Sequence, residues 1–474
     1  MNDPNAELSL AGAWEYRLDP EEVGLSEKWF EACPVEGSLI LPGSLDTNGI
    51  GTPDPRPDYM GGLTRKLRYV GPAWYFRTID LPEELRGTEL ELELERVHWF
   101  SRVWCNGQEL GAQDSLSVPH RHRFHPEGAA QLKLAIRVDN APHIPIGRIG
   151  HSLTDWTQTN WNGVIGRMSI GAVEGSLVLN VVPAGDGLVV RGSASPLAKI
   201  EIEALGQTHT VQAEVDGAFH LLLPAEGLPA WSDDAPALFE VSARSGDQVA
   251  KVRTGFRTFG AEGRRLLLNG EPVFLRGTLE ACVFPKTGYP PMDPDGWSRV
   301  YAQAKAFGLN HIRFHSWCPP RAAFEAADEI GLLLQVELPL WTGKWAMSSD
   351  PALMDFCRRE AFRILEEYGA HPSFVLFTLG NEMAFYGEEP EVDRLLRDLK
   401  AAFPHILFNF SSHGTHLSPE CDYYVQADNG KPGPQNRPLR GSTWFGVGSR
   451  FDREPPATLT TCDEASSQFD RPVI

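Results

Sequence analysis

The sequence predicts a multidomain protein in which two β-sandwich domains precede a β/α domain. The first half of the chain alternates apolar and polar residues with a period of two, and Gly, Pro and Asn turn signals interrupt this alternation. The second half alternates short apolar runs with segments of helical period. A length of 474 residues leaves room for about three domains.

Composition and charge exclude several classes of function. The chain is 42% hydrophobic and contains 13 Trp and 24 Phe, which indicates large cores rather than disorder. Its 43 basic and 63 acidic residues give a net charge of −20, which argues against nucleic acid or an anionic membrane as a partner. Seven scattered cysteines without a CxxC pair are typical of a reducing compartment. No signal peptide or membrane span is visible, so we expect a cytoplasmic protein.

Residues 1–175 are predicted to form the first sandwich. The runs Leu90–Leu94 and Leu132–Val138 alternate apolar and polar side chains, as half-buried strands do. Asn106 and Gly107 lie between two such runs and both tolerate a positive φ, so they predict a hairpin turn. No long helical period interrupts this region, which favours two packed sheets.

Three histidines lie close together in the segment His120–His125. They have no Cys or carboxylate partner nearby in the sequence, and a β-rich context surrounds them. We therefore favour a solvated strand edge over a metal site and predict no metal.

Residues 176–260 are also predicted to form strands, with a different spacing of the apolar runs. Apolar runs recur about every ten residues with Gly and Pro between them, which is typical of a small immunoglobulin-like sandwich. No pair of cysteines is available to bridge its sheets.

Residues 261–474 are predicted to alternate strands and helices. The expected helices and strands, in chain order, are 293–307, 311–314, 321–330, 332–337, 355–368, 374–379, a helix carrying Val392 to Phe403, and 405–408. This alternation indicates a parallel sheet, with a (β/α)8 barrel as the leading topology and a doubly wound sheet as the second. The region has no GxGxxG or Walker loop, which weakens a nucleotide-binding alternative, and we expect no cofactor.

Polar and aromatic residues follow one predicted strand after another. They are Arg276, Glu280, Arg313, His315, Trp317, Glu337, Trp341, Asn381, Glu382, Asn409, Ser411 and His413. A barrel would bring these strand ends to one mouth. Indoles stack on sugar rings and fixed polar groups recognise hydroxyls, so the pattern favours a carbohydrate substrate. Hydrolysis of a glycosidic bond requires two carboxyls, which stand about 5 Å apart in a retaining enzyme.

At this point several motifs resemble those of glycoside hydrolase family two, the family of β-galactosidases, β-glucuronidases and β-mannosidases. They are Trp74-Tyr-Phe-Arg77, Val103-Trp-Cys-Asn-Gly107, Asn160-Trp-Asn-Gly163, Gly255-Phe-Arg-Thr-Phe259, Leu268-Asn-Gly-Glu-Pro-Val-Phe-Leu-Arg-Gly277 and His371-Pro-Ser-Phe-Val-Leu-Phe-Thr-Leu-Gly-Asn-Glu382. The motifs occur in the same order as in the family, and the resemblance covers the whole chain. The resemblance implies a jelly-roll domain over 1–175, an immunoglobulin-like domain over 176–260 and a catalytic barrel over 261–474.

The same resemblance implies a retaining exo-β-glycosidase that hydrolyses terminal β-linked sugars, with a β-galactosidase-like enzyme as the best match. Glu382 matches the general acid/base of the family, and Asn381 matches the amide that binds the sugar 2-hydroxyl. Arg313 matches a family arginine, whereas His315 stands two residues after it rather than the usual three. Together with Trp317, Glu337 and Trp341, these residues are the expected substrate-binding set.

The end of the sequence departs from the family pattern. The segment ending at Ile474 resembles the start of the seventh barrel strand, and the family nucleophile lies just beyond such a segment. Glu454 and Glu464 precede the strand and are poor replacements. We therefore expect an incomplete barrel and an inactive fragment; a homo-oligomer is compatible with the full-length form. The alternatives are a non-catalytic carbohydrate-binding protein and an endo-acting barrel hydrolase.

Overall fold

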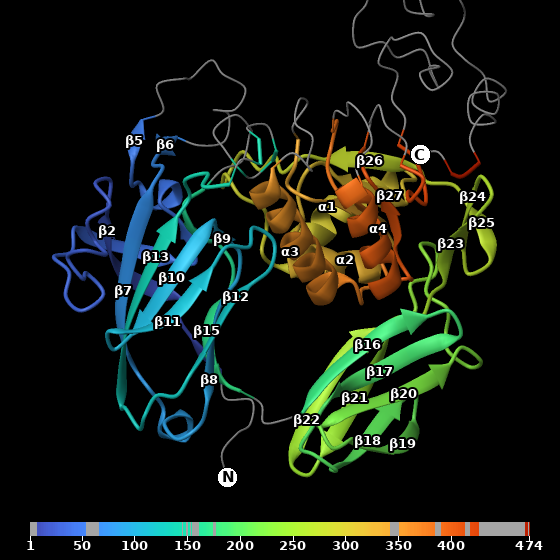
Figure 1. Cartoon of the computed structure of the whole chain (residues 1–474), viewed down its shortest axis with the longest axis horizontal. Helices are drawn as coiled ribbons and strands as arrows, with labels where there is room; N and C mark the ends of the chain where they lie inside the picture. Colours follow the sequence, from blue (N-terminus) through green and yellow to red (C-terminus); the bar gives the residue numbers. More distant parts are fainter. Residues whose placement is uncertain are drawn as a thin grey trace, which may run out of the picture.

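The computed structural model describes residues 7–53, 66–144, 146–147, 150–151, 153, 161–173, 177–341, 350–383, 390–412, 418–425, 470–472 and 474. Figure 1 shows two β-sandwiches and a third part in which helices pack on parallel strands. Within the described ranges, no helix has the length and apolarity that a membrane crossing requires.

The first sandwich is built from antiparallel sheets. Its four-stranded sheet has the order β1-β15-β8-β12, its six-stranded sheet the order β11-β10-β13-β7-β2-β3, and a small third sheet the order β4-β14-β9. The strands are β1 Glu7–Ser9, β2 Gly12–Leu18, β3 Gly37–Leu41, β4 Gly43–Ser44, β7 Pro72–Asp80, β8 Leu90–Leu94, β9 Val97–His98, β10 Phe100–Cys105, β11 Gln108–Gln113, β12 His120–Phe124, β13 Gln131–Asp139, β14 Gly163–Val164 and β15 Met168–Ala172; a separate pair is β5 Thr52–Pro53 and β6 Leu67–Arg68. The inward side chains of the two large sheets share one apolar core.

Two predictions for this sandwich have clear outcomes. The hairpin at Asn106-Gly107 is confirmed, because both residues have a positive φ and join β10 to β11. The solvated strand edge at the histidine cluster is wrong in part. β12 is the last strand of its sheet, but His120 and His122 are buried, and His120 bonds to Ser101 and Ser115. Alternate side chains of a strand face opposite sides, so the sandwich core takes up these two rings.

The second sandwich pairs a three-stranded sheet with a four-stranded one, in the orders β16-β17-β20 and β19-β18-β21-β22. The strands are β16 Val178–Ala184, β17 Gly187–Ser193, β18 Lys199–Ala204, β19 Gln207–Gln212, β20 Ala218–Pro224, β21 Phe239–Ser245 and β22 Gln248–Thr254. Their inward apolar residues form a separate core. The proposed domain boundaries near 175 and 260 remain predictions.

A buried arginine anchors the chain between the second sandwich and the β/α part. Arg257 is 1% exposed, and its guanidinium donates to the carbonyls of Pro372, Phe374 and His405. Burial lowers its pKa to about 9. The three strands that follow, β23 Phe259–Glu262, β24 Arg265–Leu268 and β25 Glu271–Val273, form a small antiparallel sheet.

The last part contains a five-stranded parallel sheet in sequence order. Its strands are β26 Gly277–Glu280, β27 His311–Phe314, β28 Leu333–Glu337, β29 Phe374–Thr378 and β30 Leu407–Asn409, and its helices are α1 Pro294–Ala306, α2 Arg321–Ile330, α3 Pro351–Tyr368 and α4 Pro390–Ala402. The predicted βα alternation is therefore present. The described residues form no closed barrel, so the eight-stranded barrel remains a prediction.

Local sequence signals explain where these helices begin. The side chain of Asp293 caps α1 by accepting from the Gly296 amide. Asp350 caps α3 in the same way, with Pro351 as the first helical residue, so this helix starts four residues before the predicted Asp355. Gly331 ends α2 in a left-handed conformation, at the predicted position.

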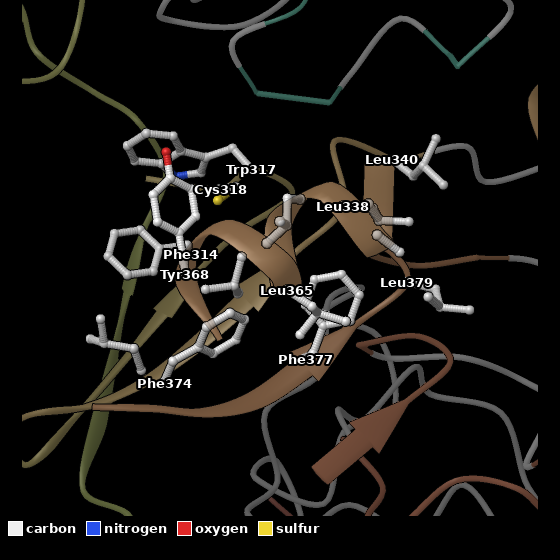
Figure 2. Close-up of a cluster of buried hydrophobic side chains, with 14 of the residues drawn as sticks. Phe314, Trp317, Cys318, Leu338, Leu340, Leu365, Tyr368, Phe374, Phe377 and Leu379 are labelled. Atoms are coloured by element: carbon white, nitrogen blue, oxygen red, sulfur yellow. The ribbon is translucent and has the colours of Figure 1, made fainter. Parts of the chain in front are cut away.

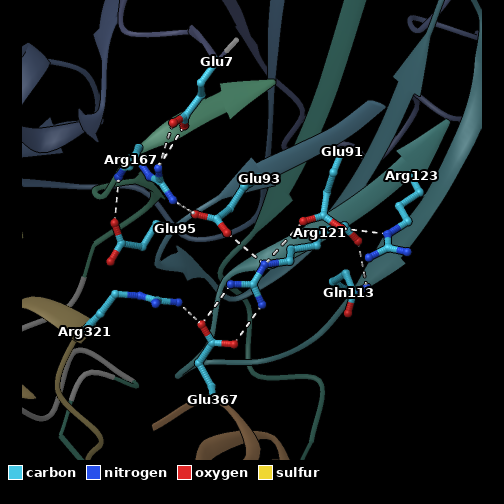
Figure 3. A network of polar contacts seen from close by, with 10 residues as sticks. All are labelled: Glu7, Glu91, Glu93, Glu95, Gln113, Arg121, Arg123, Arg167, Arg321 and Glu367. Atoms are coloured by element: carbon cyan, nitrogen blue, oxygen red, sulfur yellow. Dashed lines mark hydrogen bonds and ion pairs between the residues drawn. The ribbon is translucent and has the colours of Figure 1, made fainter. Parts of the chain in front are cut away.

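The first sandwich packs tightly against the β/α part. Trp99, Leu116 and Ile146 of the sandwich belong to the same apolar cluster as the sheet and helices, part of which Figure 2 shows. Polar contacts continue this interface. Arg121 of β12 donates to Glu367 of α3 at 2.8 Å, and Glu367 also accepts from Arg321 of α2 (Figure 3). The interface is thus suited to hold sandwich loops in fixed positions over the sheet.

Candidate active site

The central strand of the site is β29. All five residues Phe374–Thr378 are buried, as expected for a strand with apolar layers on both faces. Beyond it, Gly380 allows the chain to approach the end of the neighbouring strand. A Cβ on Gly380 would stand 3.0 Å from the Leu340 Cβ, the Leu340 carbonyl oxygen and the Met383 sulfur. Parallel bridges then join Asn381 to Trp341 and to Ser412, so three strand-end segments meet here.

Glu382 lies directly after this junction in a left-handed conformation, with φ at 48°. Such a backbone costs about 1–3 kcal/mol for a residue other than glycine and is concentrated at functional sites. The Glu382 amide donates to the Ser412 carbonyl at 2.7 Å, which holds the turn. The Trp341 indole Nε1–H donates to the Glu382 Oε2 at 2.8 Å. The carboxyl group is therefore oriented by an aromatic donor and remains partly exposed.

Glu337 has a different environment, although it also ends a parallel strand. Its side chain is 0% exposed and accepts three hydrogen bonds. The donors are Arg313 Nε at 2.7 Å, the Ser316 amide at 2.6 Å and Ser412 Oγ at 2.5 Å. A buried carboxylate with this many partners is held in place rather than free to react. Glu337 therefore organises the strand ends.

Asn381 connects this buried network to the partly exposed Glu382. Its Oδ1 accepts from Arg313 Nη2 at 2.5 Å, which fixes the amide plane. Its Nδ2 is buried and has no hydrogen-bond partner among the described residues. An unpaired buried donor costs about 1–3 kcal/mol, so a bound hydroxyl oxygen would relieve this cost. Fixed by Arg313, the amide is well suited to bind a ligand oxygen.

The remaining predicted substrate-binding residues lie in two different places. His315 is 8% exposed and lies edge-on to Trp341, with 4.6 Å between the ring centroids. It therefore joins the group around Glu382. Trp317 is 2% exposed, and its ring packs against Trp297 and Phe314 in the core of Figure 2. The structure does not bring Trp317 to this group, and its contact with substrate remains only a prediction.

Sequence reasoning missed three polar residues of the group: His151, Ser316 and Ser412. Ser316 has a φ of 50° and presents its amide to Glu337. Ser412 stands next to Ser411, which the strand-end pattern had identified. His151 comes from the first sandwich, and no local signal links it to the β/α strands. His413, Glu454 and Glu464 lie outside the described residues. Across the described ranges, no three or more His, Cys, Asp or Glu side chains are arranged to hold a metal ion.

Glu280 is a further carboxyl at the end of β26. Both of its oxygens stand 3.0 Å from the Cys282 amide, which donates to them. Burial raises the pKa of Glu280 to about 7. Because the folded state prefers the protonated form, the stability that Glu280 contributes is present below pH 4.5 and is lost as the pH rises towards 7.

Glu280→Gln is therefore expected to stabilise the protein at pH 8, by about 2 kcal/mol, and much less at pH 5. Glutamine keeps an oxygen for the Cys282 amide and carries no charge. Urea unfolding at the two pH values measures the difference. Glu271→Gln, at an exposed strand position, is the matched control. An equal gain at both pH values would contradict the burial argument.

The fold is similar to those of solved β-glucuronidases. A β-glucuronidase from an uncultured Clostridium sp. aligns with 100% of this chain and 83% of its own, at a TM-score of 0.75 and 16% identity. The β-glucuronidase of Ruminococcus gnavus aligns with 92% of this chain and 78% of its own, at a TM-score of 0.70 and 18% identity. The chain therefore has the multidomain, mostly β fold that these glycosidases share.

Sequence relatives agree with this fold class. No family model matches the chain. A β-galactosidase of Arthrobacter sp. (strain B7) is 24% identical over 78% of this chain and 36% of its own length. A β-glucuronidase of Paenibacillus borealis is 22% identical over 80% of this chain and 68% of its own length. The chain spans only about a third to two thirds of these relatives. Its sequence is similar to those of β-galactosidases and β-glucuronidases, the enzymes whose motifs it resembles.

Proposed function

We propose that the protein is a retaining exo-β-glycosidase that removes terminal β-linked sugars, with Glu382 as the general acid/base. The observation that carries this proposal is the pairing of two neighbours at one strand end. Glu382 is partly exposed and oriented by Trp341, and Asn381 presents a buried, unpaired Nδ2 beside it. One group can exchange a proton with the glycosidic oxygen, and the other can bind an adjacent sugar hydroxyl.

The proposed reaction has two steps. In the first step, a carboxylate nucleophile attacks the anomeric carbon and displaces the leaving oxygen. The Glu382 carboxyl gives its proton to this leaving oxygen. In the second, the Glu382 carboxylate takes a proton from water, which attacks the same carbon and releases the nucleophile. Asn381 Nδ2 would bind the 2-hydroxyl during both steps. Glu337 is an unsuitable nucleophile, because its oxygens are buried and already bonded to three donors.

A neutral sugar fits the site better than a uronic acid. A uronate carboxylate needs a cationic partner, and among the described residues Arg313 is a cation that bonds to Asn381, the neighbour of Glu382. Its guanidinium is already paired with Glu337 and Asn381. This occupancy, together with the β-galactosidase relatives, makes a β-galactoside the best candidate substrate.

Hydrolysis of 4-nitrophenyl β-galactoside, β-glucoside, β-mannoside and β-glucuronide tests the proposal, with the α-galactoside as the matched control. In a full-length form that carries the nucleophile, we expect the β-galactoside to be cleaved fastest, with the β-anomer as the first product seen by NMR. A first product of inverted configuration would exclude a retaining mechanism. Cleavage at internal bonds of an oligosaccharide would favour the endo-acting alternative.

Calorimetric titration with a galacto-configured isofagomine separates the remaining outcomes. Its ring cation is expected to bind beside the Glu382 carboxylate whether or not turnover occurs. Inhibitor binding without hydrolysis would agree with a nucleophile outside residues 1–474. Turnover by these residues would overturn that expectation and leave the role of Glu382 intact. Binding of glycans without inhibitor binding and without hydrolysis would favour a non-catalytic carbohydrate-binding protein.

A further inference from the structure

A side chain of the first sandwich, that of His151, lies in the group around Glu382. His151 follows β13 in the chain and lies against the ends of β27 and β28. Gly150 makes this approach possible, because a Cβ there would stand 2.9 Å from the Pro339 carbonyl oxygen. The sandwich segment at Gly150 therefore lies close to Pro339, two residues before Trp341.

His151 is held by polar contacts at the end of β27. Its amide and its Nδ1 lie 3.2 and 3.1 Å from Ser316 Oγ. Its Nδ1 also lies 3.2 Å from His315 Nδ1. Two neutral imidazoles can form this hydrogen bond only if one Nδ1 carries a proton and donates, while the other Nδ1 is unprotonated and accepts. Ser316 in turn donates its amide to Glu337, so His151 is tied to the buried network.

Both imidazoles contact the Trp341 indole. The His151 ring stacks on it with the centroids 5.8 Å apart and an interplanar angle of 23°. The His315 ring meets the indole edge-on, at 4.6 Å and 65°. Trp341 is the residue that donates to Glu382 Oε2. The two histidines thus restrain the orientation of the donor on which the carboxyl group depends.

The charge state of the pair makes this restraint sensitive to pH. The pKa of both His151 and His315 is lowered to about 4, mainly by burial. At His151 the neighbouring His315 ring and the Arg313 guanidinium also lower the pKa while Glu337 raises it, and at His315 the Arg313 guanidinium adds to the effect of burial. Among the residues that the structure describes, the uncharged Ser316 hydroxyl and Trp341 indole also face the pair, with Glu382 beyond the indole. At neutral pH both rings are uncharged, and two charged rings cannot share the Nδ1 contact.

We infer that His151 is a positioning residue, supplied by the first sandwich, that orients Trp341 and through it the Glu382 carboxyl. It touches neither Glu382 nor the proposed reacting atoms. The inference rests on the proposed function only in its consequence for Glu382; the packing of Trp341 can be measured without any turnover. It gives the first sandwich a direct part in forming the site.

Fluorine NMR of the protein labelled with 5-fluorotryptophan tests the positioning role, with Trp341→Phe used to assign the resonance. We expect His151→Ala to shift and broaden the Trp341 signal, and His151→Phe, which keeps a stacking ring, to restore its line width in part. In the wild type the signal should move as the pH falls from 6 to 4. His125→Ala, an exposed histidine of the same sandwich, is the matched control. An unchanged Trp341 signal in His151→Ala would overturn the inference.

Binding of galacto-configured isofagomine tests the consequence for Glu382. His151→Ala is expected to weaken it about tenfold and His151→Phe less, because a small misplacement of a site group has effects of this size or larger. A shifted Trp341 signal with unchanged inhibitor affinity would overturn the link from Trp341 to Glu382. If the wild type itself does not bind the inhibitor while the Trp341 signal responds, the proposed function fails and the packing role of His151 stands.

Discussion

In a full-length form that carries the nucleophile, Glu382→Gln is expected to lower kcat/KM on substrates with poor leaving groups by about 10²–10⁴-fold. Glutamine keeps the size of the side chain and an acceptor for the Trp341 indole but has no proton to give. Substrates with activated leaving groups such as 2,4-dinitrophenol need little protonation, so their first step should lose much less. Values of kcat/KM, which depend on the first step alone, show the difference as a steeper dependence on the leaving group over a series of aryl β-galactosides of graded phenol acidity.

Glu280→Gln is the matched control for this experiment. It changes another carboxyl at a parallel strand end, on the outermost strand rather than on β29. It is expected to leave the dependence on the leaving group unchanged. An equal loss of kcat/KM across all leaving groups in Glu382→Gln, or the same steepening in Glu280→Gln, would remove Glu382 from the role of general acid.

Arg313→Ala is expected to lower the free energy of unfolding by about 3–5 kcal/mol, which is the usual cost of removing one partner of a buried ion pair. Glu337 is 0% exposed and would lose the one cationic contact that it makes within the described ranges, keeping the Ser316 and Ser412 bonds. Asn381 would also lose the bond that fixes its amide plane. Urea unfolding measures the stability, and isofagomine titration measures the effect on the site.

Two further variants make this result specific. Arg313→Ala combined with Glu337→Gln should recover part of the loss, because the remaining partner is no longer charged. Arg276→Ala, an exposed arginine just before β26, should cost less than about 1 kcal/mol. A loss in Arg313→Ala no larger than in Arg276→Ala would show that the pair contributes little.

Much of the fold could be predicted because its signals are local. Asp293 and Gly331 mark helix ends in the sequence itself, and α2 and β27 have the bounds that the periodicity predicts. α3 begins earlier than predicted, because the Asp350 cap was overlooked. The burial of His120 and His122 could not be predicted, because the face of an edge strand that becomes covered depends on which sheet packs against it.

The candidate site could likewise be predicted only in part. Asn381, Glu382, Arg313 and Glu337 could be predicted as a group, because parallel strands place their carboxyl ends along one edge. Trp317 also follows a strand, yet its ring turns into the core against Trp297. Whether a side chain at a strand end faces the core or the open edge depends on its neighbours in space.

The sequence by itself determined the order of the two β-rich parts and the β/α part, the βα alternation and the chemistry available at the strand ends, because these depend on residue type and short-range spacing. Only the tertiary structure decided that Glu337 is buried in a network while Glu382 stays partly exposed. It also brought His151 from the first sandwich to Trp341, across 190 residues of sequence. Contacts of this kind arise from the packing of separate domains, and no local pattern encodes them.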